Sequence, residues 1–159
     1  SALCALHYNY RVSAPQLLTK KVGLATLLVV RIYKKLLAYA SIDPHRENLD
    51  LEDVFKHYSP ANRDEIIGYN VPNPTDEIDP AVLKARWSDI MESVKNDLPE
   101  ADELYNMMVK AGCVTELADA HLSPEFALEA LRYSPFMRRR ITLLRILPML
   151  GIEEDVIKL

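Results

Sequence analysis

The most hydrophobic stretch of the chain lies within residues 15–41 and predicts its central helix. From Val22 to Tyr33 the residues are apolar on almost every side at helical spacing, so a helix there has to be surrounded by other helices. Pro15 suits the first helical turn, where its missing N–H costs nothing. Gly23 inside such a helix costs about 1 kcal/mol relative to alanine unless it permits close packing. We therefore expect another backbone or a ligand to approach at Gly23.

Apolar residues elsewhere recur at intervals of three and four, which predicts further helices around the central one. We expect these helices over residues 1–12, 49–58, 63–67, 80–96, 99–111, 124–133, 138–147 and 153–159. Residues 68–75 are expected to be a loop, because each proline disfavours helix at the residue before it. No stretch alternates like a β-strand. The pattern therefore predicts an all-α fold, a single multi-helix domain over residues 1–159 around a buried central helix.

Residue types mark several of the expected helix boundaries. Asp79 precedes Pro80 and Ser123 precedes Pro124, so each pair offers a capping side chain and a proline at the first helical position. Gly112 is placed to end the helix before it, since glycine readily adopts the left-handed conformation. These positions predict where three of the helices begin or end.

Charge is unevenly distributed along a chain of ordinary globular composition. The net charge is -4, with 49% hydrophobic and 26% charged residues. Residues 1–42 and 132–159 have an excess of lysine and arginine, whereas residues 43–131 have an excess of acids. This pattern has two explanations: the segments attract one another in the fold, or the two basic ends line a site for an anion such as phosphate.

Several protein classes are disfavoured by what the chain lacks. Between Lys21 and Arg31 lie only nine uncharged residues, about half of the ~20 that a membrane span needs. Cys4 and Cys113 lack the paired spacing of a disulfide framework or a zinc site, which favours a reducing, cytoplasmic location. The four glycines form neither a GxGxxG motif nor a P-loop, so no cofactor is expected.

Five basic residues are the candidates for an anion-binding site. Helix N-termini attract anions, and lysines beside them add compact positive charge. The candidates are Lys20, Lys21, Arg138, Arg139 and Arg140. A run of three arginines is more often a solvated helix start, and in an acidic protein it is a weak indication of nucleic-acid binding.

The histidines do not indicate a metal site or a catalytic group. None of His7, His45, His57 and His121 lies three or four residues from another, as paired helical ligands do. His7 is expected to be packed or hydrogen-bonded, whereas the other three fall in or beside predicted loops and are expected to face solvent. No serine or cysteine lies in a GxSxG-like motif, so no catalytic residue is predicted.

Taken together, the motifs resemble the C-terminal helical domain of the glycerol-1-phosphate dehydrogenases, in the iron-containing alcohol dehydrogenase and dehydroquinate synthase superfamily. Residues 21–26 are similar to the family's KVGxxT segment at the start of its long helix. Residues 122–131 and 137–144 are similar to its closing pattern, in which a helix is followed by an IRxRYTIL-like helix. Trp87 and residues 108–112 stand at similar spacings. The resemblance implies a dehydroquinate synthase-like helical domain from the C-terminal part of a larger protein.

The chain departs from this family at the metal site. The family's SEHxxSH and HGxKVG segments each supply a metal-ligating histidine, and here Leu3 and Leu18 stand at those positions. His7 corresponds to the second, non-ligating histidine of the first segment. Leucine offers no lone pair, and the family's metal polarises the substrate during hydride transfer. The resemblance thus implies a degenerate site with no metal, and the family's NAD(P)-binding half is not in the chain.

Three functional interpretations follow. The leading one is a degenerate, metal-free helical domain of the glycerol-1-phosphate dehydrogenase type with a structural, interaction or regulatory role, which is not an enzyme as an isolated chain. The second is the substrate half of an active NAD(P)-dependent polyol-phosphate dehydrogenase, in which His7, Lys20 and Lys21 replace the lost ligands. The third is an anion- or nucleic-acid-binding helical module.

The partners expected from the sequence depend on the cleft wall around Leu3 and Leu18. Apolar side chains there would form a hydrophobic patch, which soluble monomers rarely leave open. We expect a neighbouring domain or a second copy, as a homodimer, to cover the Leu3 and Leu18 face. A small phosphate-bearing ligand is the other expected partner, and neither a membrane nor nucleic acid is expected.

Overall fold

The computed structural model describes residues 15–158, with side chains from residue 22 onward, and every regular element in that part is helical. The α-helices are α2 (Pro15–Leu36), α3 (Leu51–Lys56), α4 (Arg63–Asn70), α5 (Pro80–Ala85), α6 (Trp87–Asp97), α7 (Ala101–Lys110), α8 (Pro124–Tyr133), α9 (Leu143–Ile146) and α10 (Glu153–Val156). Short 3-10 helices join them: η1 (Pro60–Asn62), η2 (Pro74–Glu77), η3 (Ala118–Ala120), η4 (Ser134–Met137) and η5 (Leu147–Leu150). The predicted all-α class is confirmed.

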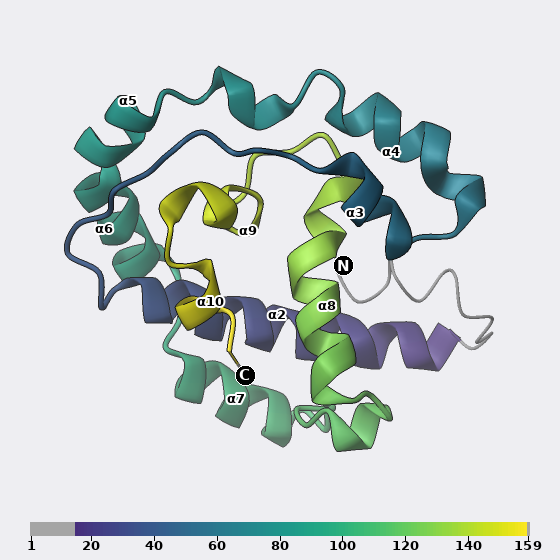
Figure 1. Ribbon diagram of the computed structural model, residues 1–159. Helices are drawn as coiled ribbons and strands as arrows, with labels where there is room; N and C mark the ends of the chain where they lie inside the picture. The colour runs from purple at the N-terminus through teal and green to yellow at the C-terminus, as the bar shows by residue number, and fades with distance from the viewer. Residues whose placement is uncertain (1–14, 159) are drawn as a thin grey trace.

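The long helix α2 is the element around which the others are arranged. It packs against α7, α6, α10 and η3. The chain from α3 to α6 forms an arch, and α9 lies inside this arch (Figure 1). Most of the apolar side chains of α2 are buried: Leu24, Ala25, Leu27, Leu28, Val30, Ile32 and Leu36.

Gly23 permits a close contact between α2 and α7. A Cβ atom at Gly23 would lie 3.1 Å from Cε of Met108, which is tighter than an ordinary van der Waals contact. The expected close approach at Gly23 is made by a side chain of α7, whereas the sequence led us to expect a backbone or a ligand.

The predicted helix boundaries at the Asp-Pro and Ser-Pro pairs are confirmed. The Asp79 side chain accepts a hydrogen bond from the backbone N–H of Ala81 at 2.8 Å. The Ser123 hydroxyl accepts one from the N–H of Phe126 at 3.1 Å. Gly112 follows the end of α7 with φ of +71°, the left-handed conformation that ends helices.

The helix predicted over residues 138–147 is wrong. Arg138 is extended, with φ -152° and ψ 141°, and the helix α9 begins only at Leu143. The physical reason is a cap inside the predicted span: the Thr142 side chain accepts a hydrogen bond from the N–H of Arg145 at 3.2 Å. The three arginines therefore lie on an extended connection and not at a helix start.

Two further helix predictions need correction. The helix expected over residues 80–96 is divided at Arg86, where φ is -96° and ψ is 5°. Directly after the break, the Trp87 indole N–H donates to the carbonyl of Tyr39 at 2.8 Å and fixes the start of α6. The loop expected from residue 68 starts later, because α4 continues to Asn70, whose side-chain amide donates to the Ile66 carbonyl.

A buried ion pair ties the segment before α3 to α9. Arg145 Nη1 lies 2.8 and 2.7 Å from the two carboxylate oxygens of Glu47, and the two side chains are 1% and 5% exposed. Arg145 Nη2 also donates to the side-chain oxygen of Asn73 at 2.8 Å. The Thr75 hydroxyl donates to Glu47 at 2.7 Å. Nearly every polar atom of the pair thus has a partner, as buried charges require.

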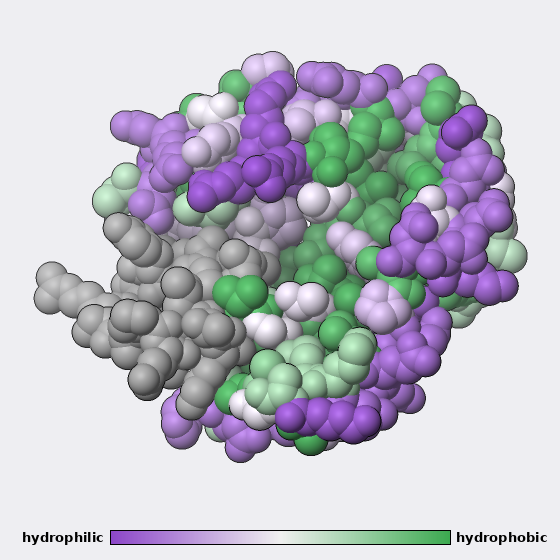
Figure 2. Space-filling view, turned by 180° about the vertical axis from the view of Figure 1, so that it is seen from behind, coloured by the Kyte–Doolittle hydropathy of each residue, from purple (hydrophilic) through white to green (hydrophobic). Residues whose placement is uncertain are grey.

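One face of the molecule is hydrophobic in its middle. Seen from the side opposite to Figure 1, hydrophobic side chains gather in a hollow in the middle of the molecule, with hydrophilic side chains on much of its border (Figure 2). Within residues 15–158, no helix combines the length and the apolar character that a membrane span needs.

Candidate functional site

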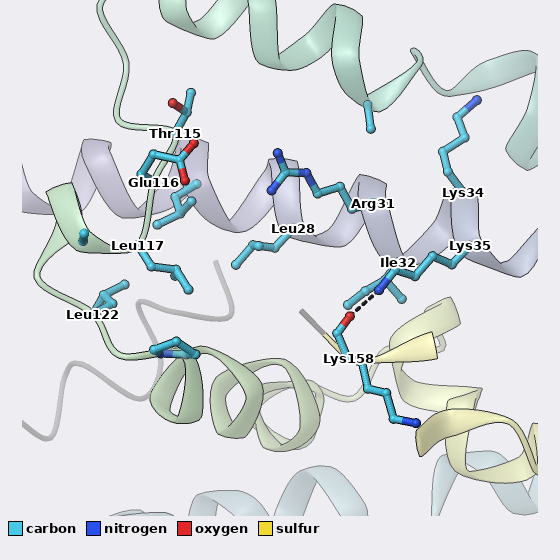
Figure 3. A pocket seen from close by; sticks show the side chains of 14 residues that line it. Leu28, Arg31, Ile32, Lys34, Lys35, Thr115, Glu116, Leu117, Leu122 and Lys158 are labelled. Atoms are coloured by element: carbon cyan, nitrogen blue, oxygen red, sulfur yellow. Dashed lines mark hydrogen bonds between the residues drawn. The ribbon is translucent and has the colours of Figure 1, made fainter. Parts of the chain in front are cut away.

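A cavity of about 820 Å³ lies beside α2 and is the candidate binding site. This volume falls within the ~300–1,000 Å³ of typical small-molecule sites. Leu28 and Ile32 of α2 line one wall, and Leu117 and Leu122 lie across from them (Figure 3). The remaining lining residues are Leu24, Arg31, Lys34, Lys35, Ala101, Thr115, Glu116, Ala118, Pro124 and Lys158.

The helical repeat of α2 builds the first wall. Leu24, Leu28 and Ile32 are spaced four residues apart, so they lie on one side of the helix. The second wall comes from the connection between α7 and α8. There the N–H of Leu122 donates to the carbonyl of Leu117 at 3.0 Å, and His121 takes a left-handed conformation with φ of 54°. This tight turn places both leucines against the cavity.

Positive charge surrounds the apolar walls. Among the described residues, the cations Arg31, Lys34, Lys35 and Lys158 line the cavity together with one carboxylate, Glu116. Lys34 and Lys158 are paired with Glu100 and Asp155 at 2.8 and 3.2 Å, so the positive potential at the cavity comes mainly from Arg31 and Lys35. The cavity therefore favours an anionic group at its rim and an apolar group inside.

Two of these lysines are held by the protein itself. Lys34 Nζ donates to the carbonyl of Leu98 at 2.9 Å and pairs with Glu100 at 2.8 Å, so it joins the end of α6 to the start of α7. Lys35 Nζ donates to the backbone carbonyl of Lys158 and holds the end of the chain against α2 (Figure 3).

The three arginines predicted to bind an anion lie elsewhere, on the connection before α9. Arg138 is 3.9 Å from Glu65, and Arg139 is 3.5 Å from Glu77. Arg140 is exposed. This connection and the start of α2 lie at different places in the fold (Figure 1). Two of the three guanidinium groups are thus already paired with acids of the chain.

The other predicted site residues lie at or before the start of α2. Lys20, Lys21 and Leu18 belong to that helix, but their side chains are outside the described residues. Leu3 and His7 lie wholly outside them. The anion site, the lost metal ligands and the covered face around Leu3 and Leu18 therefore stay predictions.

His57 contradicts the prediction that it faces solvent. Its Nδ1 lies 2.8 Å from a Glu129 carboxylate oxygen, and its ring stacks on Tyr133 with 3.6 Å between centroids. The Tyr133 hydroxyl in turn donates to Asp53 at 2.9 Å, which lowers the pKa of that carboxyl. Burial raises the pKa of Tyr133. His45 and His121 are exposed, as predicted.

A smaller cavity of about 360 Å³ lies between α3 and α10. Most of its charged groups already have partners, either within the lining or beside it. Arg132 lies 3.4 Å from Glu153 and 2.6 Å from Glu154, and burial raises the pKa of Glu153. A site whose charged groups already have partners offers less to a ligand than the cavity beside α2.

Within residues 15–158, no three His, Cys, Asp or Glu side chains stand close enough together to hold a metal ion. No family model, curated protein or solved structure matches the chain. The resemblance to the glycerol-1-phosphate dehydrogenases therefore rests on the sequence motifs alone.

Proposed function

We propose that this chain is a ligand-binding helical domain that takes a small amphiphile into the cavity beside α2. The observation that supports this is the combination of leucine-rich walls with a cationic rim. An elongated molecule with an apolar body and an anionic end group fits both parts. Within a larger protein, such a domain would have the interaction or regulatory role that we expect from the sequence.

Burial of the apolar body would supply most of the affinity. Each methylene removed from water contributes about 0.8 kcal/mol. A body of roughly ten carbons therefore offsets much of the ~4–15 kcal/mol that association costs, with the rim charges contributing the remainder. We expect dissociation constants in the micromolar range, on the order of 10⁻⁶ M.

The alternative function, the substrate half of a polyol-phosphate dehydrogenase, would require a different ligand. A polyol phosphate is also an anion, which the rim could accept, but it has no apolar body to fill the space between Leu28 and Leu117. The cavity therefore favours an acyl-type ligand over a polyol phosphate.

A displacement assay tests the proposal. The fluorescent amphiphile anilinonaphthalene sulfonate is bound to the protein and displaced with dodecanoate below its micelle concentration. Ala118→Trp fills the cavity from η3, whereas Ala81→Trp is the matched control, because Ala81 is an exposed alanine that does not line the cavity. Circular dichroism verifies that both variants are folded.

We expect saturable binding at one site, weakened about tenfold or more by Ala118→Trp and unchanged by Ala81→Trp, since a filled pocket excludes the ligand. Absence of saturable dodecanoate binding by the unmodified protein would contradict the proposal. Equal weakening by the two tryptophans would do the same.

A further inference from the structure

The cations around the cavity differ in how far the protein already uses them. Lys34 is held by the carbonyl of Leu98 and by Glu100, and Lys158 Nζ pairs with Asp155 at 3.2 Å. Lys35 donates to the backbone carbonyl of Lys158. The contacts of these three lysines are therefore part of the fold.

Arg31 is different. Its guanidinium carbon lies 5.9 Å from the centre of the Tyr105 ring, a weak cation–π contact. Among the described residues, no carboxylate forms a salt bridge with Arg31. A planar guanidinium offers five donors suited to a carboxylate or phosphate. Arg31 is thus the cation best placed to receive an anionic group.

Glu116 is the matching uncommitted acid on the opposite wall. It is exposed and forms no salt bridge with a cation of the described residues. In the view of Figure 3, the labelled side chains of Glu116 and Arg31 both lie above Leu28, and both residues line the cavity. The cavity lining therefore includes one cation and one acid that form no salt bridge with other described residues, together with apolar side chains.

We propose that the ligand carries a zwitterionic head on its apolar body, with its anion on Arg31 and an ammonium group on Glu116. A ligand with an anion alone would place a second negative charge near Glu116, which like-charge repulsion disfavours. An ammonium group beside the anion turns this repulsion into a charge-assisted hydrogen bond. This inference rests on the proposed function and specifies the ligand class of the same cavity.

Isothermal titration calorimetry with three probes of equal chain length tests the inference. The probes are dodecanoate, dodecylammonium and the zwitterion 2-aminododecanoate, each below its micelle concentration. The variants are Glu116→Gln, which keeps the shape of the side chain, and Arg31→Met, which keeps an unbranched apolar stem, and each removes one charge. Glu92→Gln is the control, because Glu92 is an exposed acid on α6 that does not line the cavity.

We expect the unmodified protein to bind 2-aminododecanoate about two- to fivefold more tightly than dodecanoate, within the range for exposed charge pairs. Glu116→Gln should remove the preference for 2-aminododecanoate. This variant should bind dodecanoate as tightly as the unmodified protein does, or more tightly. Arg31→Met should weaken the binding of both probes that carry a carboxylate, and Glu92→Gln should change nothing. The exchange of both charges, Arg31→Glu with Glu116→Arg, should restore the preference for the zwitterion.

The failures of the two proposals are distinguishable. If dodecanoate binds as tightly as 2-aminododecanoate, or if Glu116→Gln leaves the preference intact, the zwitterionic head is wrong while amphiphile binding stands. Tightest binding of dodecylammonium would also overturn the assignment of the anion to Arg31. If no probe binds, both proposals fail.

Discussion

Arg145 shows at the scale of a single residue how this fold uses buried charge. Its side chain is 1% exposed, pairs with Glu47, and lies 4.5 Å from the centre of the Phe136 ring. Removal of one partner leaves the other charge buried without compensation, which costs about 3–5 kcal/mol. We expect Arg145→Met to lower the free energy of unfolding by that amount, measured by urea denaturation with far-ultraviolet circular dichroism.

Two comparisons separate this effect from a general loss of charge. Glu47→Leu combined with Arg145→Met removes both charges, so the double variant should lose less stability than the sum of the single variants. Lys84→Met breaks the exposed pair with Asp43 and should leave the urea midpoint nearly unchanged. An Arg145→Met protein as stable as the Lys84→Met protein would show that the buried pair is not important for the fold.

Glu153 gives a prediction for the dependence of stability on pH. Burial raises its pKa, so the folded protein holds this proton more tightly than the unfolded chain does. The ionised form therefore lowers stability above the folded pKa, and this cost disappears as the pH falls below the unfolded value of 4.5. Glu153→Gln should be more stable than the unmodified protein at pH 7, with the difference vanishing in acid.

Thermal denaturation between pH 3 and pH 8 measures this difference. Arg132 keeps Glu154 at 2.6 Å in the variant, so it is not left without a partner. The opposite result would be a Glu153→Gln protein that loses stability relative to the unmodified protein as the pH rises from 4 to 7. It would mean that the ion pair with Arg132 stabilises the fold by more than the burial of the Glu153 carboxylate costs.

At the scale of the helix pair α2 and α7, Gly23 sets how closely the helices approach. A methyl group there meets only the flexible end of Met108. Gly23→Ala should therefore gain up to about 1 kcal/mol from helix propensity, reduced by the shift of Met108. Gly23→Leu should lose roughly 1–3 kcal/mol or more, because a larger side chain overpacks the contact. Chemical denaturation measures the free energy of unfolding of both variants. Equal losses of stability in Gly23→Ala and Gly23→Leu would contradict this account of the contact.

The helix boundaries that local chemistry determines could be predicted from the sequence, and those that tertiary contacts determine could not. The caps at Asp79 and Ser123 depend only on neighbouring residues. The break at Arg86 has no local signal and coincides with the bond from the Trp87 indole to the distant Tyr39. Thr142 was a readable signal, since a threonine before an apolar run is a capping residue, and it marks the real start of α9.

At the scale of the whole molecule, the cavity was beyond sequence reasoning because its two walls are far apart in the chain. One wall comes from residues 24–35 and the other from residues 115–124, with Lys158 at the rim. The sequence shows that α2 carries apolar residues followed by basic ones, but not which surface they meet. Free charges such as Arg31 and Glu116 can be distinguished from paired ones such as Lys34 only when the contacts are known.

The central claim is that an amphiphile occupies the cavity between α2 and the connection that precedes α8. The most direct measurement is nuclear Overhauser spectroscopy on methyl-labelled protein with unlabelled dodecanoate. We predict cross-peaks from the dodecanoate methylenes to the methyl groups of Leu28, Leu117 and Leu122, which line both walls. Cross-peaks only to exposed methyls outside the cavity, such as those of Met107 and Val109, would contradict the account, as would their complete absence at saturating dodecanoate.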